Sequence, residues 1–176
     1  HIALALGHCK LEWQQNILEN ILSKLNNISL RNRILNILAI ASWRSSSFIF
    51  MLSQDSIVKI IGILYSTLSY NFKQERKDFR NIIKQLELLL AILRAREKFS
   101  VLCLDNIQTQ KYIILIDKLT KYIVNEKIQL KTRLQFDLIK TNDFKDTPDL
   151  LYALRMYLSG NIKATQSIKV LGVSDD

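Results

Sequence analysis

Residues that interrupt helices are scarce in this chain. It has one proline and four glycines among 176 residues, while 48% of its residues are hydrophobic. Inside a helix, glycine and proline cost about 1 and 3 kcal/mol relative to alanine, so a chain that avoids both can form long helices. Helices this rich in leucine and isoleucine bury one face against each other. The scarcity therefore predicts a mainly α-helical fold.

Apolar residues recur three and four positions apart along most of the chain, which is the period of an amphipathic helix. The expected helices cover residues 11–25, 30–43, 56–70, 75–98, 108–126 and 148–159. The segment 30–43 is apolar almost all round, so we expect it to be the central helix. Asp55, and either Asp105 or Asn106, are expected to cap the helices that follow them, and Gly160 to end the last helix.

Two short segments near the C-terminus have a different period. Between residues 130 and 138, four apolar residues alternate with polar ones, and these are Leu130, Leu134, Phe136 and Leu138. Such alternation is typical of a half-buried strand, and residues 168–173 indicate a second one. Because an isolated strand pair is marginal in water, we expect both strands to pack on the helices or to join a sheet from elsewhere.

The expected organisation is a helical body over 1–127 and a strand–helix–strand element over 128–176 that packs on it. Three short blocks resemble each other, at 37–40, 89–92 and 151–154. They favour a helical-repeat stack of the HEAT or armadillo type, although their spacing exceeds the roughly 40–47 residues of such units. An irregular helical bundle is the alternative. Because the chain starts at His1, we expect a fragment of a larger protein.

The formal net charge is +9, and most of the excess lies in the first 100 residues. A basic balance suggests nucleic acid, an anionic membrane surface or an acidic protein as partner, or merely a soluble surface. The segment 34–54 carries one charge and reaches the length of a membrane span only by crossing Arg44 and three serines, and the uncharged segment 60–72 is too short, so we expect buried helices there instead. Two cysteines are too few for a disulfide framework, which favours an intracellular location, cytoplasmic or nuclear.

A series of cationic residues along the helix expected over 75–98 is the best candidate site. The residues proposed to contact nucleic acid are Lys73, Arg76, Lys77, Arg80, Lys84, Arg94 and Arg96. Four of them, Lys73, Lys77, Arg80 and Lys84, recur at spacings of four, three and four and so share one helix face. A cationic helix face can follow a phosphate backbone. The alternative is an ordinary solvated face, because Asp78 and Glu87 interrupt it.

Residues suited to catalysis or metal binding are few. The only histidines are His1 and His8, and His8 is adjacent to Cys9, so their side chains do not face each other on a helix. No histidine–cysteine ligand set and no glycine-rich phosphate loop occurs in the sequence. We therefore expect no catalytic residues, no metal site and no cofactor, and we expect that the protein is not an enzyme.

The sequence favours a non-catalytic interaction or scaffold module within a larger protein or assembly. A protein is the first expected partner, with the strand over 130–138 as a partner-binding edge. Binding of DNA or RNA through the cationic helix face is the alternative. Pairing of the same strand with a second copy of the chain leaves a homo-oligomer open.

Overall fold

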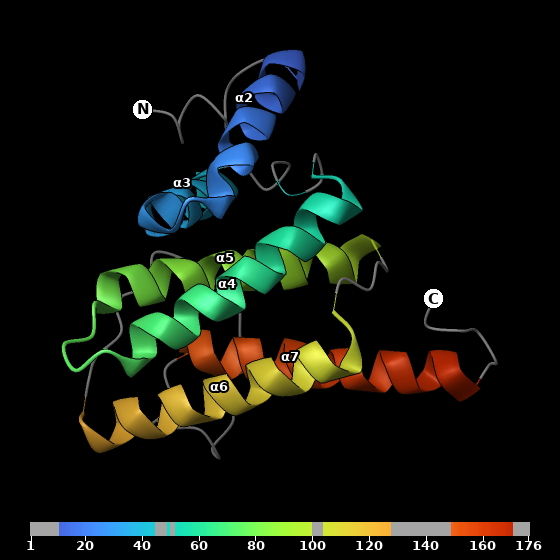
Figure 1. Cartoon of the computed structure of the whole chain (residues 1–176). Helices are drawn as coiled ribbons and strands as arrows, with labels where there is room; N and C mark the ends of the chain where they lie inside the picture. Colours follow the sequence, from blue (N-terminus) through green and yellow to red (C-terminus); the bar gives the residue numbers. More distant parts are fainter. Residues whose placement is uncertain (1–10, 45–48, 50–51, 100–103, 128–148, 171–176) are drawn as a thin grey trace.

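The computed structural model describes residues 11–44, 49, 52–99, 104–127 and 149–170, and most of these residues are helical (Figure 1). The α-helices are α2 (Leu11–Ser23), α3 (Arg31–Arg44), α4 (Gln54–Lys73), α5 (Phe79–Phe99), α6 (Asn106–Asn125) and α7 (Asp149–Val170). Two short 3₁₀ helices, η1 (Lys24–Asn26) and η2 (Ile28–Leu30), link α2 to α3. The predicted mainly helical fold is confirmed, and the described residues contain no strand.

Side-chain caps decide where three of these helices begin. Asp105 caps α6 as expected, because its carboxylate accepts from the Gln108 N–H at 2.7 Å in a reciprocal capping box. Ser53 rather than Asp55 caps α4, since its hydroxyl accepts from the Ser56 N–H. Asp78 accepts from the N–H groups that follow it, so α5 begins at Phe79, four residues later than predicted.

Helix α5, and not α3, lies at the centre. It packs against α3, α4 and α7, and the consecutive residues Leu88, Leu89 and Leu90 are all fully buried. Because successive residues lie about 100° apart around a helix, burial of three in a row requires neighbours on several sides. Helix α3 exposes Arg33 to solvent. The prediction that 30–43 forms the central helix was therefore wrong.

The last four helices form two stacked pairs. Helices α4 and α6 run in one direction, α5 and α7 run in the opposite direction, and each helix packs on its pair partner (Figure 1). The two pairs also contact each other: the first helices of the pairs, α4 and α6, are in contact, and so are the second helices, α5 and α7. Helix α3 lies against α5 on the side away from α7 (Figure 1).

A cluster of three amides, of which Asn71 and Gln85 are buried, joins α3 to the α4–α5 pair. Gln85 of α5 is fully buried, and its Nε2 donates to Asn32 Oδ1 at 2.7 Å. Asn71 Nδ2 of α4 donates to the same Asn32 oxygen at 3.0 Å and to Gln85 Oε1 at 3.2 Å. Buried amides are tolerated when they bond to each other, and these bonds hold only in one helix register.

The C-terminal segment differs from its prediction. Helix α7 continues through Gly160 to Val170, so Gly160 does not end the helix and residues 168–170 are helical rather than a strand. A glycine ends a helix only where the backbone turns left-handed, and otherwise it costs about 1 kcal/mol and is tolerated. The predicted strand over 130–138 lies outside the described residues. The division at residue 127 stays a prediction, although α7 packs against α5 and α6.

Candidate functional site

One face of α5 has no fully buried residue. Its residues are Arg80, Lys84, Glu87, Ala91 and Arg94, spaced four, three, four and three apart, and we call them the α5 stripe. The two arginines are exposed and the other three residues are half-buried. With a rise of 1.5 Å per residue, the stripe is roughly 21 Å long.

The α5 stripe carries three cations against one carboxylate. Among the residues that the structure describes, no ion pair or hydrogen bond engages the side chains of Arg80, Lys84 or Arg94. Charged groups that have no internal partner keep their full attraction for an external one. Three of the seven residues predicted from the sequence therefore lie together on a surface that can receive an anionic partner.

Lys77 was predicted on the same face and is used differently. Its Nζ lies 4.7 Å from the ring centroid of Tyr122 and 5.3 Å from that of Phe72, and it donates to the Gln74 carbonyl oxygen at 2.9 Å. Phe72 meets Tyr122 edge to face, and Phe79 stacks over the same ring. Lys77 therefore closes the α4–α5 turn by cation–π contacts, which makes it a structural residue.

The remaining cations of the prediction do not lie on the α5 stripe. Lys73 is the last residue of α4, and Arg76 is exposed in the turn before α5. The prediction that Lys73, Lys77, Arg80 and Lys84 share one helix face was wrong, because the Asp78 cap delays the start of α5. The side chain of Arg96 lies outside the described part of the structure, as do Leu130, Leu134, Phe136 and Leu138.

Two tyrosines of α6, Tyr112 and Tyr122, lie near lysines in the sequence, which would suit an exposed position. Tyr112 instead is buried, with 1% of its surface exposed, and its hydroxyl donates to the Ile61 carbonyl oxygen at 2.6 Å. The signal for this was its position four residues before Ile116, on the apolar face of the helix. Tyr122 is half-buried against the rings described above.

A small pocket that the sequence did not indicate lies between α4 and α6. It has a volume of about 210 Å³. Its lining includes Gly62, Tyr65 and Ser66 of α4 and Gln108, Lys111 and Tyr112 of α6. The Tyr65 and Tyr112 rings meet edge to face, with centroids 5.2 Å apart, and form its apolar side.

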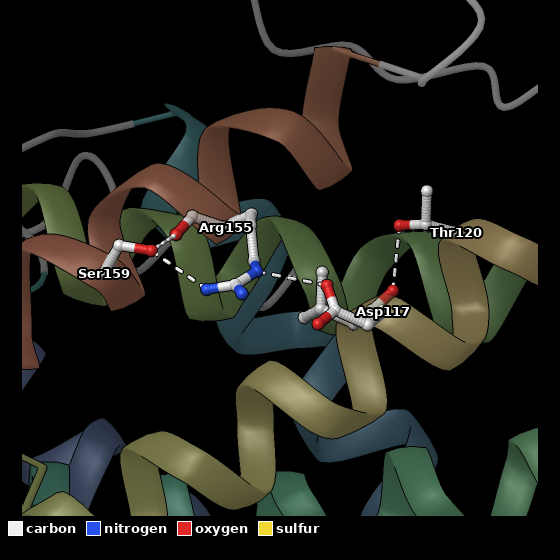
Figure 2. Close-up of polar contacts among 5 residues, drawn as sticks. Asp117, Thr120, Arg155 and Ser159 are labelled. Atoms are coloured by element: carbon white, nitrogen blue, oxygen red, sulfur yellow. Dashed lines mark hydrogen bonds and ion pairs between the residues drawn. The ribbon is translucent and has the colours of Figure 1, made fainter. Parts of the chain in front are cut away.

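The contact between α6 and α7 includes an ion pair. Arg155 Nε lies 3.1 Å from Asp117 Oδ1, and Arg155 Nη1 donates to Ser159 Oγ at 2.9 Å (Figure 2). Figure 2 shows the guanidinium of α7 pointing toward the carboxylate of α6. Arg155 thus has partners within the protein, which separates it from the free cations of the α5 stripe.

The described residues include no candidate for a membrane span or for a metal site. No helix there is both long and apolar enough to cross a membrane. No group of three or more histidine, cysteine or acidic side chains there could hold a metal ion. His1, His8, Cys9 and Cys103 lie outside the described part of the chain.

Comparison of the chain with known proteins finds no match to a protein-family model, to a curated protein or to a solved structure.

Proposed function

We propose that this chain is a non-catalytic interaction module of the helical-repeat type, and that the α5 stripe binds an acidic segment of a protein partner. The observation that carries this proposal is the combination of burial and charge on α5. The helix is packed on three sides, yet its fourth side carries three cations that have no ion-pair partner among the described residues. A role as part of a larger intracellular protein is retained from the sequence as a prediction.

The stacking of the helices supports the helical-repeat part of the proposal. In solenoid proteins, successive helix pairs stack so that equivalent helices contact each other, as α4–α5 and α6–α7 do here. The three similar sequence blocks lie on α5 and on two helices that pack against it. Residues 89–92 lie on α5, and the blocks at 37–40 and 151–154 lie on α3 and α7, which pack on α5 from different sides.

The composition of the α5 stripe favours a protein over a nucleic acid. Ala91 contributes one apolar residue to it, and Glu87 would repel a phosphate backbone. The stripe has no aromatic side chain on which a base could stack. Nucleic acid remains the second candidate, because three free cations over roughly 21 Å are also suited to contacting phosphates.

The test is fluorescence polarisation with three labelled probes: an acidic, leucine-containing peptide, a single-stranded RNA and a duplex DNA. The variant is Arg80→Glu/Lys84→Glu/Arg94→Glu. The matched control is Lys59→Glu/Lys118→Glu/Lys121→Glu, which makes the same charge change at exposed lysines of α4 and α6. We expect the stripe variant to bind the peptide about tenfold or more weakly, and the control to bind nearly as the wild type does.

Equal losses in the two variants would mean that only net charge matters, which contradicts a site on α5. Stripe-dependent binding of RNA or DNA that is tighter than peptide binding, and that weakens steeply with salt, would put nucleic acid in first place.

A further inference from the structure

The α4–α6 pocket is lined by residues of α4 and α6, whereas the α5 stripe lies on α5. The pocket has no part in the function proposed above. Its size limits its ligand. Pockets for drug-sized molecules have volumes of about 300–1,000 Å³, whereas this one has about 210 Å³. It can therefore take one side chain or a small molecule of similar size.

Several polar groups in the pocket wall already have internal partners. Tyr112 Oη donates to the Ile61 carbonyl oxygen at 2.6 Å, and Ser66 Oγ donates to the Gly62 carbonyl oxygen at 3.2 Å. Gln108 Oε1 accepts from the Asp105 N–H in the capping box. These bonds hold the wall in place before any ligand arrives, which lowers the entropy lost on binding.

Three donors in the wall remain free among the described contacts, and these are Tyr65 Oη, Gln108 Nε2 and Lys111 Nζ. Gln108 and Lys111 lie three residues apart on α6 and so project from the same side of the helix. Both groups donate hydrogen bonds, and one of them is positively charged. An anion is the strongest acceptor for this pair of donors, and a planar carboxylate has an oxygen for each of them.

Gly62 is the second observation that points to a ligand. It lies inside α4, where glycine is unfavourable relative to alanine. A Cβ added at Gly62 would meet no atom within 4 Å, so the packing of the chain does not require glycine at this position. The missing side chain instead leaves the pocket wall open beside Tyr65, where an aliphatic stem could lie against the ring.

We propose that the α4–α6 pocket binds a carboxylate carried on a short aliphatic stem, with Gln108 Nε2 and Lys111 Nζ as the hydrogen-bond donors and Gly62 as the opening. A glutamate side chain of a partner and a free dicarboxylic acid share this chemistry. A neutral amide of the same shape lacks the charge and also presents an N–H₂ group to the two donors, so the pocket discriminates against it.

The test is a titration of the ¹⁵N-labelled 176-residue chain followed by amide chemical shifts. The probes are glutarate, N-acetyl-glutamate methylamide and the neutral N-acetyl-glutamine methylamide. We expect saturable shifts at Tyr65, Lys111 and Tyr112 with both carboxylates, with half-saturation of the order of 1 mM for ligands this small. The neutral amide should give no saturable shift. The carboxylate that binds more tightly identifies the source, partner side chain or free acid.

Two pairs of variants localise the effect. Gly62→Leu fills the opening and should weaken carboxylate binding about tenfold or more, while Gly160→Leu, at another helical glycine with open space around it, should leave binding unchanged. Lys111→Met should weaken binding and Lys118→Met, at an exposed lysine elsewhere on α6, should not. Thermal melts confirm that each variant is folded. Binding that survives in Gly62→Leu, or that is equal for the neutral amide, overturns the proposal.

Discussion

The α4–α5 turn and the α5 stripe each contain a lysine that was predicted to bind nucleic acid. The structure gives these two lysines opposite roles. Lys77 in the turn lies against two aromatic rings and donates to a backbone carbonyl. Lys84, seven residues later, has no partner in the described part of the structure. The two lysines differ only in what the fold brings beside them. A cation near ring faces stabilises the protein, whereas a cation on an uncovered helix side is available to a partner.

The largest expected loss of stability comes from a substitution on the buried side of α5, compared with one in the α5 stripe. Gln85→Ala removes a fully buried side chain and leaves Asn32 and Asn71 without two of their hydrogen bonds. We expect a loss of about 3 kcal/mol in the free energy of unfolding, from the cavity and the unsatisfied amides together. The neighbouring Lys84→Ala should change it by less than about 0.5 kcal/mol. Urea denaturation followed by circular dichroism measures both, and similar losses would show that α5 has no distinct inner and outer sides.

The second prediction concerns Lys77 itself. Lys77→Met keeps much of the aliphatic stem but removes the charge over the Phe72 and Tyr122 rings. We expect a loss of about 1 kcal/mol in the free energy of unfolding, since the ammonium is half-buried against the rings. Lys84→Met is the matched control and should be close to neutral. If both substitutions are neutral by denaturant titration, the aromatic contacts of Lys77 contribute nothing and the comparison fails.

The third prediction concerns the residue that separates the turn from the helix. Asp78→Ala removes the carboxylate that accepts from the Arg80 and Asn81 N–H groups at the start of α5. Loss of such a cap costs about 1 kcal/mol. Asp55→Ala, which alters an acidic residue in the first turn of α4 that is not its cap, should cost about 0.3 kcal/mol. Thermal unfolding by calorimetry ranks the two, and the reverse order would contradict the assignment of the caps.

The smallest effect is expected for a cation that does have an acidic partner. Arg155 and Asp117 form an ion pair whose side chains are 39% and 55% exposed, so solvent screens much of their attraction. A double-mutant cycle with Arg155→Met and Asp117→Asn should give a coupling energy of about 0.2–1 kcal/mol that decreases at high salt. A coupling that is larger and insensitive to salt would mean that this pair is more strongly desolvated than its exposure indicates.

The helical class and the approximate extent of most helices could be predicted because they depend on local spacing. The apolar series from Phe79 to Leu93 marks α5, and Asp105 marks the start of α6, where a capping box forms. The start of α5 was missed because Glu75 and Arg76 suit a helix as well as a turn. Only the hydrogen bonds that the Arg80 and Asn81 N–H groups donate to Asp78 distinguish the turn from the helix.

The candidate sites were predictable only in part. Arg80 and Lys84 were predicted to share one helix face by sequence spacing alone, whereas Arg94 was predicted only as a further cation along the same helix. The α4–α6 pocket was not predicted, since its two walls come from residues more than 40 positions apart in the chain. The amide cluster was missed for the same reason, because Asn32, Asn71 and Gln85 look like ordinary surface residues until three helices meet.

The sequence by itself determined that this protein would be helical, because scarce glycine and proline and a regular apolar spacing act within a few residues of each other. Its positive charge and several members of the α5 stripe follow from the same local information. Tertiary structure alone decided that α5 is central, that Lys77 lies among aromatic rings while Lys84 does not, and that Gly62 borders a pocket. Burial and cation–π contact depend on which residues become neighbours in space, and the spacing of residues along the sequence does not specify those neighbours.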